Sequence, residues 1–267
     1  MTQRIMVTGC SSPRGIGSAT ARELASRGHR VIATVRRHDH DRDLCRGLES
    51  HLSVISMDLL DEKSVRTALA KVDSLLGGVD VLVNNAGFGL IGGIEQTTLD
   101  QARAQFETNY FGTLGLVRQV LPQMRSQRGG HILAVSTMFA RTLCPIAIGH
   151  YIASKVALET ALEALGREAA PWGIRVTNVQ PGPVDTELSR QWSRPDNDPR
   201  PGLIEELYDW LGTQSAIRME SARDVGAGIA SIIEDEDPPP AAQTSSAATA
   251  WVARSLRDPS RRTECTE

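Results

Sequence analysis

Six short apolar runs, each followed by a stretch with helical periodicity, constrain the fold of this chain more than any other feature. The runs are Ile5–Thr8, Arg30–Val35, Leu52–Met57, Val79–Val83, His131–Ser136 and Ile174–Val179. Nearly continuous apolar runs of this length are typical of parallel strands that are buried on both faces. Strands that alternate with helices form a doubly wound parallel sheet, so the sequence predicts an α/β fold of this kind.

The chain length predicts a single domain. Its 267 residues are enough for one α/β unit with a large core. We place this domain at residues 1–237, with residues 189–212 as a loop and a helix on the substrate side. Residues 238–267 begin with three prolines and continue with many Ala, Ser and Thr residues, which predicts a poorly fixed C-terminal tail.

A glycine-containing turn follows the first predicted strand. Gly9, Gly15 and Gly17 lie between that strand and a helical stretch that continues to Arg27. Glycines let the backbone approach a ligand closely, and a helix N-terminus offers free N–H groups and a positive dipole end. The turn therefore predicts a binding site for a diphosphate, although such a turn can also simply reverse the chain.

The end of the second strand indicates which dinucleotide binds. An acidic residue at this place hydrogen-bonds the 2′-hydroxyl of NAD, whereas an arginine suits the 2′-phosphate of NADP. This chain has Arg36 and Arg37 there, with no carboxylate before Asp39, and Arg14 in the turn offers another cation. Guanidinium groups bind phosphate through paired, charged hydrogen bonds. The arginines favour NADP(H), the alternative being that they are solvated surface charges.

Polar and small residues follow the later strands, at the edge where α/β sheets bind ligands. Asn84-Asn85-Ala86-Gly87 follows the fourth strand, Ser136-Thr137 ends the fifth, and Gln180 to Thr186 follows the sixth. A long helical region from about Thr98 to Gln127, interrupted late by Pro122, carries Asn109 among apolar neighbours. This amide is either a satisfied core group or part of a proton relay.

Tyr151 and Lys155 lie four residues apart in a predicted helix, so they project from the same face. A phenol loses its proton near pH ~10, and a nearby ammonium lowers that pKa. The pair is therefore suited to exchanging a proton with an alcohol or a carbonyl group at neutral pH. The same spacing also arises by chance on amphipathic helices.

Together and in this order, the glycine turn, Asn-Asn-Ala-Gly and Tyr-x-x-x-Lys resemble the short-chain dehydrogenase/reductase family over roughly residues 4–190. The resemblance implies a Rossmann-type single domain that transfers a hydride between NAD(P) and a carbonyl or alcohol. It implies that Tyr151 is the acid or base, that Lys155 binds the nicotinamide ribose and lowers the pKa of Tyr151, and that Asn109 holds a relay water. The residues expected at the cofactor are Gly9, Ser11, Arg14, Gly15, Ile16, Gly17, Arg36, Arg37, Asp58, Leu59, Asn85, Ala86, Gly87, Tyr151, Lys155, Pro181, Gly182, Val184 and Thr186.

The chain departs from the family pattern in three places. The glycine turn is two residues longer, as though Pro13-Arg14 were inserted. The family usually has a serine that hydrogen-bonds the substrate carbonyl, and counting along the chain places Thr137 there. Because the run from Pro145 to Tyr151 is one residue longer than usual, Ser136 stays an alternative. A β-branched seventh strand near the C-terminus is not evident.

The expected substrate is a medium-sized, largely apolar carbonyl compound or secondary alcohol. Nine apolar or aromatic residues near the predicted cleft are candidates to line its pocket, although each is also a plausible core residue. They are Phe88, Leu90, Met138, Phe139, Leu143, Leu188, Trp192, Tyr208 and Trp210. The alternative function is a non-catalytic NADP(H) sensor or scaffold on the same fold.

Composition narrows the possible partners. A net charge of −3 gives no reason to expect nucleic acid or an anionic membrane surface. No stretch of about 18 apolar residues is present, and the N-terminus lacks the apolar region of a signal peptide. Four scattered cysteines without a Cys-x-x-Cys pair indicate reduced thiols and no metal site. We expect a cytoplasmic homodimer or homotetramer.

Overall fold

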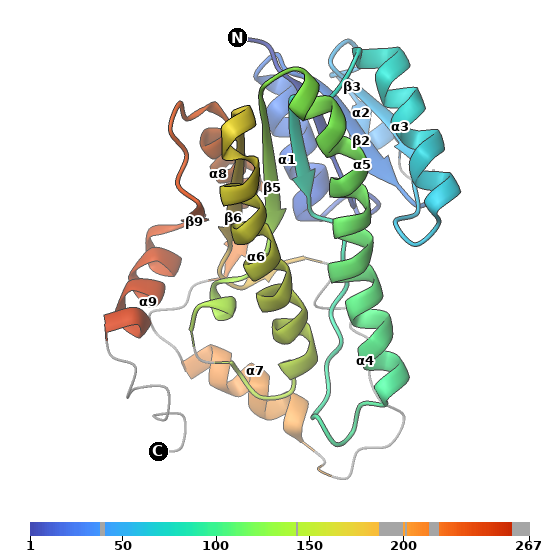
Figure 1. The fold of residues 1–267 in the computed structure, drawn as a ribbon. Coiled ribbons are helices and arrows are strands. Elements are labelled where there is room, and N and C mark those ends of the chain that lie inside the picture. The colour runs from blue at the N-terminus through green and yellow to red at the C-terminus, as the bar shows by residue number, and fades with distance from the viewer. Residues whose placement is uncertain (38–40, 143, 187–199, 201, 214–218, 258–267) are drawn as a thin grey trace.

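The structure, a computed structural model, is centred on a seven-stranded parallel sheet (Figure 1). It describes residues 1–37, 41–142, 144–186, 200, 202–213 and 219–257. The strand order is β3-β2-β1-β4-β5-β6-β9. Successive strands are added on one side of β1 up to β3, and on its other side from β4 onward, so the order switches between β1 and β4. These strands are β1 (Arg4–Val7), β2 (Arg30–Val35), β3 (Leu52–Ser56), β4 (Val81–Asn84), β5 (Gly130–Val135), β6 (Ile174–Gln180) and β9 (Ala241–Gln243). The predicted doubly wound, Rossmann-type α/β domain is confirmed.

Helices cover both faces of the sheet. The helices are α1 (Ile16–Ser26), α2 (Asp41–Cys45), α3 (Glu62–Leu76), α4 (Leu99–Phe106), α5 (Thr113–Ser126), α6 (Gly149–Ala169), α7 (Leu203–Thr213), α8 (Ala222–Glu234) and α9 (Ser246–Arg257). Helices α1, α2 and α8 contribute to the hydrophobic cluster on one face, and α3, α5 and α6 contribute to the cluster on the other. Figure 1 shows α7 beyond the carboxyl ends of the central strands.

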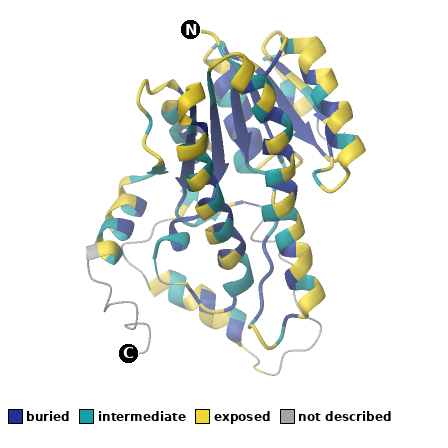
Figure 2. Cartoon of the chain, viewed as in Figure 1, coloured by how far each residue is buried: buried dark blue, intermediate teal, exposed yellow. Residues whose placement is uncertain are grey.

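The alternation of side chains along each strand explains why helices must pack on both faces of the sheet. In β1, Ile5 and Val7 pack towards α1 and α8, whereas Met6 packs towards α3, α5 and α6. Successive side chains of a strand point to opposite faces, so a strand that is apolar throughout must lie between two layers. Figure 2 shows the result, with buried strands inside and exposed residues on the outer faces of the helices.

The helical region expected from Thr98 to Gln127 is divided by a π-helical segment, η1 (Glu107–Gly112). Helix α4 begins with a capping box in which Thr98 and Gln101 bond each other's backbone N–H groups. The expected late interruption at Pro122 is wrong, because Pro122 lies inside α5 without ending it. The irregular turn instead contains Asn109, and π turns within helices are frequent at functional sites.

The prediction of a poorly fixed tail is wrong for residues 241–257. Strand β9 pairs with β6 in parallel, in the register Asn178 to Ala241, and so completes the sheet. Helix α9 then packs Trp251 and Val252 into a third hydrophobic cluster with α7. The strand was not evident in the sequence because it has three residues and none of them is β-branched.

Two further short strands, β7 (Val184–Asp185) and β8 (Glu220–Ser221), pair in parallel outside the main sheet. The substrate-side loop expected from residue 189 onward falls largely on 187–199, which lie outside the described residues, and the helix expected after it is α7. Within the part of the chain that the structure describes, no helix is long and apolar enough to cross a membrane.

Candidate active site

The glycine turn after β1 has the close packing that a diphosphate site needs. Gly9 has φ +74°, and a Cβ atom there would lie 2.6 Å from Ala86 Cα. A Cβ atom on Gly17 would lie 2.5 Å from the side-chain nitrogen of Asn85. Gly15 is the N-cap of α1 and provides no side-chain cap, so the first N–H groups of the helix are available to an anion. The turn therefore fits a dinucleotide diphosphate.

The two additional residues of the turn form a local loop that leaves this site intact. The N–H of Gly15 donates to the carbonyl oxygen of Ser12 at 3.0 Å, closing the loop around Pro13 and Arg14. The hydroxyl of Ser18 lies 2.6 Å from the same carbonyl oxygen. Arg14 does not line the cofactor cleft, because it points to Asp185, with 3.2 Å between their charged groups.

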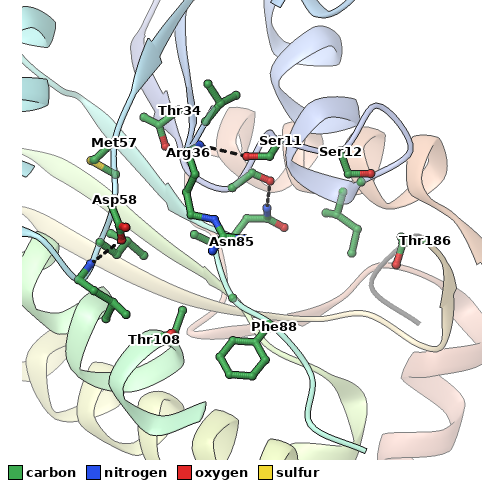
Figure 3. Close-up of a pocket in the computed structure, with 18 residues that line it drawn as sticks. Ser11, Ser12, Thr34, Arg36, Met57, Asp58, Asn85, Phe88, Thr108 and Thr186 are labelled. Atoms are coloured by element: carbon green, nitrogen blue, oxygen red, sulfur yellow. Dashed lines mark hydrogen bonds between the residues drawn. The ribbon is translucent and has the colours of Figure 1, made fainter. Parts of the chain in front are cut away.

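A cleft with a volume of about 290 Å³ lies at the carboxyl ends of β1, β2, β3 and β4. Figure 3 shows side chains from these strand ends around it. The predicted cofactor residues that line it are Gly9, Ser11, Gly15, Ile16, Arg36, Asp58, Leu59, Asn85, Ala86, Gly87 and Thr186. The lining residues that sequence reasoning missed as cofactor contacts are Ser12, Thr34, Val35, Met57, Leu60, Phe88 and Thr108. Several of these sit at strand ends, which is the signal that would have identified them.

Arg36 and Asp58 are the charged residues of this cleft. The backbone N–H of Arg36 donates to the hydroxyl of Ser11 at 3.1 Å, which ties the end of β2 to the glycine turn (Figure 3). Asp58 accepts a hydrogen bond from the N–H of Leu60 at 3.0 Å. Arg37, also predicted at the cofactor, is exposed and does not line the cleft. The end of β2 therefore presents one guanidinium, that of Arg36, to the cleft.

Asn85 stabilises the junction between β1 and β4. Its side-chain amide donates to the carbonyl oxygens of Thr8 and Gly9, at 2.9 and 3.1 Å. The hydroxyl of Thr8 in turn accepts from the N–H groups of Asn85 and Ala86, both at 3.0 Å. These bonds hold the two strand ends together where the strand order reverses, beside the glycine turn. Gly17, buried against Asn85, supports this junction rather than lining the cleft.

A second cavity, with a volume of about 430 Å³, adjoins the cleft, since Ile16 and Thr186 line both. None of its described lining residues has a charged side chain. They are Ile16, Ser136, Thr137, Phe139, Ile148, Tyr151, Pro181, Gly182, Pro183, Val184, Thr186, Leu207, Tyr208, Leu211, Gly212 and Met219. The cavity therefore suits an uncharged, largely apolar molecule.

Of the nine pocket candidates, Phe139 and Tyr208 line this second cavity, and Phe88 lines the cofactor cleft. Leu90 and Met138 are core residues, each 1% exposed, and Trp210 packs between Phe139 and Trp251. Leu143, Leu188 and Trp192 lie outside the described residues. Sequence reasoning missed Ile148, Met219 and the α7 residues Leu207 and Leu211. Apolar residues at helical spacing, such as the α7 pair, look alike whether they face a core or a pocket.

Helix α6 places Tyr151 in the wall of the second cavity and Lys155 one turn further into the protein. The Nζ atom of Lys155 lies 5.9 Å from the centre of the Tyr151 ring and donates to the carbonyl oxygen of Val135 at 2.7 Å. Burial raises the pKa of Tyr151 to about 12. Burial also lowers the pKa of Lys155 to about 8, although the charge of Glu159 acts in the opposite direction.

The expected lowering of the Tyr151 pKa by Lys155 is therefore not found in this structure, where the cost of burying a phenolate raises that pKa. A phenol with this pKa is protonated at neutral pH. It is consequently in the form that donates a proton.

Asn109 lies beside this pair in the π-helical segment η1. Its side-chain oxygen accepts from the N–H of Phe88 at 3.1 Å, and its nitrogen donates to the hydroxyl of Ser154 at 3.1 Å. A Cβ atom on Gly87 would lie 2.8 Å from the Asn109 oxygen and 3.7 Å from Lys155 Nζ. The structure thus brings Asn109, Gly87 and Lys155 together.

Ser136 and Thr137 both line the second cavity, but their hydroxyls have different surroundings. The Ser136 hydroxyl is buried and has no hydrogen-bond partner among the described residues. The Thr137 hydroxyl accepts from the N–H of Phe139 at 3.4 Å, at the start of the short helix η2 (Met138–Ala140). Because this bond uses an oxygen lone pair, the hydroxyl proton of Thr137 stays available to another acceptor.

The segment after β6 forms another part of the wall of the second cavity, where the predicted residues Pro181, Gly182, Val184 and Thr186 all lie. The backbone N–H of Gly182 donates to the carboxylate of Glu220 at 2.8 Å. The same carboxylate accepts from the hydroxyls of Thr244 and Ser245, at 2.6 and 2.9 Å. Glu220, which lies on β8, thus connects this wall to the segment between β9 and α9.

Comparison with known proteins agrees with this geometry. The chain matches the short chain dehydrogenase family over residues 3–197. It is 34% identical over 243 residues to a 3-ketodihydrosphingosine reductase of Bacteroides thetaiotaomicron, covering 89% of this chain and 86% of that protein. It is 33% identical to retinol dehydrogenase 8 of Bos taurus, covering 96% of this chain and 86% of that protein. A solved short-chain dehydrogenase of Streptomyces avermitilis has a TM-score of 0.83 and 30% identity, with 99% of this chain and 95% of that chain covered. The chain therefore belongs to the short-chain dehydrogenase family of oxidoreductases, which use nicotinamide cofactors.

Proposed function

We propose that this protein is an NADP(H)-dependent oxidoreductase that interconverts a carbonyl group and a secondary alcohol on a medium-sized, largely apolar substrate. The observation that carries the proposal is the position of Tyr151. It lines an uncharged cavity that adjoins the cofactor cleft, and Lys155 lies one helical turn behind it. A proton donor and a candidate substrate site thus adjoin the cleft whose residues would hold the hydride-carrying cofactor.

When bound in the cleft, the nicotinamide cofactor supplies or accepts the hydride. In the direction of reduction, Tyr151 donates its phenolic proton to the carbonyl oxygen of the substrate. The ammonium of Lys155 stabilises the phenolate that remains on Tyr151. A hydroxyl of Thr137 or Ser136 donates a hydrogen bond to the same substrate oxygen, and this bond strengthens as negative charge develops there. The role of Asn109 in holding a relay water stays a prediction.

The preference for NADP(H) rests on Arg36. Its guanidinium group is in the cleft at the end of β2, where the adenosine ribose binds in folds of this type. The carboxylate of the cleft, that of Asp58, lies after β3 and not after β2. Among the described residues, the end of β2 offers this cation and no carboxylate, which favours the 2′-phosphate over a free 2′-hydroxyl.

The size and chemistry of the second cavity support an apolar substrate. Its volume of about 430 Å³ and its uncharged described lining match sites for small, mainly apolar molecules. The two relatives with high coverage are named for 3-ketodihydrosphingosine and retinol, both of which are lipids. These names support a lipid-like ketone or alcohol as the first class of compound to test.

The turnover experiment follows directly. Purified protein is mixed with NADPH and, separately, with aliphatic, aromatic and long-chain ketones, and the loss of NADPH absorbance is recorded. We expect oxidation of NADPH with at least one apolar ketone and none with charged keto acids. Tight NADPH binding without oxidation by any carbonyl compound, and without reduction of NADP by the matching alcohols, would instead support the sensor or scaffold function.

Counting along the chain favours Thr137 as the hydroxyl that bonds the substrate carbonyl; Ser136 and Thr137 both line the second cavity, and each has a hydroxyl proton available there. We expect Thr137→Val, which keeps the shape but removes the hydroxyl, to lower kcat by about 10²-fold, the usual loss for a donor of this kind. Ser136→Ala is the matched control and is expected to retain most of the turnover. Steady-state kinetics of both variants decide the assignment, which is reversed if Ser136→Ala loses kcat and Thr137→Val does not.

The cytoplasmic location and the homodimer or homotetramer expected from the sequence stay predictions. Size-exclusion chromatography with light scattering measures the assembly state directly.

A further inference from the structure

A carboxylate that the proposed reaction does not use is buried one turn beyond Lys155. Glu159 is 2% exposed and lies on α6, four residues after Lys155 and eight after Tyr151. Residues four apart on a helix are neighbours, so the side chains of Glu159 and Lys155 share one face. An ionised carboxylate at such depth needs charged or polar partners, and this one has several.

The first partner of Glu159 is Arg141. The Nε atom of Arg141 donates to the Glu159 carboxylate at 2.7 Å, and the same guanidinium bonds Glu163. Arg141 ends the short helix η2, which begins at the N-cap Thr137. The Arg141–Glu159 ion pair therefore ties the segment that carries the candidate carbonyl donor to the helix that carries the candidate acid.

The second partner is Gln180, at the end of β6. Its side-chain nitrogen donates to both carboxylate oxygens of Glu159, at 3.0 and 2.9 Å. Its side-chain oxygen accepts from Gln243 of β9 at 2.8 Å, so the network continues into the C-terminal strand. The carboxylate is thus fixed from the η2 segment and from the sheet together.

The other groups near Lys155 are uncharged in this structure. Val135 of β5 contributes a backbone carbonyl oxygen, and Gly87 and Asn109 contribute backbone and an amide. On α6 itself, Tyr151 is protonated at neutral pH, because burial raises its pKa to about 12. Among the described residues, Glu159 is the charged group that acts on the Lys155 pKa, and it raises that pKa.

We propose that Glu159 is a positioning residue of this active site, which favours the ammonium form of Lys155 and, through Arg141, fixes the Thr137 segment against α6. The expected effect of Glu159 on turnover rests on the proposed function, whereas its expected effect on the pKa of Lys155 is independent of catalysis. Burial lowers the pKa of Lys155 to about 8, so a loss of the Glu159 charge lowers it further and leaves less ammonium at neutral pH.

The chain offers a direct measurement, because it contains three lysines and the other two, Lys63 and Lys71, are exposed. Protein labelled with carbon-13 in its lysine side chains is titrated by NMR without cofactor, and Lys63→Arg and Lys71→Arg assign the signals. We expect Glu159→Gln to move the Lys155 titration to lower pH. Arg141→Gln, which removes the cation that balances Glu159, is expected to move it to higher pH. If the ion pair only held the fold together, the two variants would not shift the Lys155 titration in opposite directions.

Turnover provides the second readout. A fall of about one unit in the Lys155 pKa reduces its ammonium fraction about twofold at pH 7 and about tenfold at pH 9. We therefore expect Glu159→Gln to lower kcat about twofold at pH 7 and about tenfold at pH 9, while the Kd of NADPH stays within about twofold. Glu163→Gln is the matched control, since Glu163 also bonds Arg141 from α6 but its side chain is 36% exposed. It is expected to change neither the Lys155 titration nor kcat.

The results separate this inference from the proposed function. Wild-type protein that turns over no carbonyl compound contradicts the proposed function, and the lysine titration still tests Glu159. Folded Glu159→Gln with an unchanged Lys155 titration and unchanged kcat overturns the inference. If Glu159→Gln does not fold, Arg141→Gln tests the inference instead. A Lys155 titration in Arg141→Gln that is unchanged or shifted to lower pH then overturns the inference.

Discussion

Tyr151→Phe is expected to lower kcat by about 10²- to 10⁴-fold, the contribution typical of a positioned general acid. The substitution removes the phenolic hydroxyl next to Lys155 and keeps the ring that packs against the third hydrophobic cluster. The Kd of NADPH is expected to change little, because Tyr151 lines the second cavity and not the cofactor cleft. Steady-state kinetics with an apolar ketone and fluorescence titration with NADPH measure the two quantities separately.

Tyr110→Phe is the matched control for this prediction. Tyr110 lies in η1 and packs into the hydrophobic cluster of α3, α5 and α6, outside both cavities. Loss of its hydroxyl is expected to leave kcat within about twofold, the range usual for surface or core changes away from a site. Wild-type turnover in Tyr151→Phe would remove Tyr151 as the acid and would assign proton transfer to water or to another hydroxyl.

Arg36→Asp is expected to reverse the cofactor preference. It removes a charged hydrogen-bond donor and places a carboxylate where a 2′-phosphate carries negative charge, so NADPH affinity is expected to fall about 10²-fold or more. NADH affinity is expected to rise, because a carboxylate at the end of β2 accepts a hydrogen bond from a free 2′-hydroxyl. Ratios of kcat/KM for NADPH and NADH, measured with one ketone, quantify the change.

Arg37→Asp is a stringent control, since it makes the same change of charge one residue away. Arg37 is exposed and does not line the cleft, so we expect its variant to lose NADPH affinity only through long-range electrostatics. This loss shrinks as salt is added. Equal effects of the two substitutions would show that the charge of the loop, and not a contact from Arg36, sets the cofactor preference.

The strands and their order of appearance follow from the sequence because apolar periodicity is a local property. The predicted bounds of β2 are the observed ones. Helix α3 is likewise bounded by local signals, since Asp61 caps its start and Gly77 ends it. The residues around the cleft could likewise be predicted from the sequence, because in a parallel sheet the residues that follow each strand meet at one edge. For this reason Gly9, Asn85 and Arg36 were identified without coordinates.

The second cavity was harder to predict from the sequence. Its walls come from α6, from the segment after β6 and from α7, and apolar side chains on a helix look alike whether they face a core or a pocket. Leu207 and Leu211 were therefore missed, whereas Leu90 and Met138 were wrongly included among the pocket candidates. Strand β9 was missed because pairing with β6, and not its own composition, makes it a strand.

The sequence by itself determined the doubly wound sheet, the glycine turn and the Tyr151–Lys155 pair, since each depends on residues that are close along the chain. Only the tertiary structure decided the chemistry of that pair. Burial, which depends on segments distant in the sequence, raises the pKa of Tyr151 to about 12 and lowers that of Lys155 to about 8. The tertiary structure likewise brought Arg141 and Gln180 to Glu159, and Gln243 to Gln180, because a buried carboxylate must find its partners wherever the fold places them.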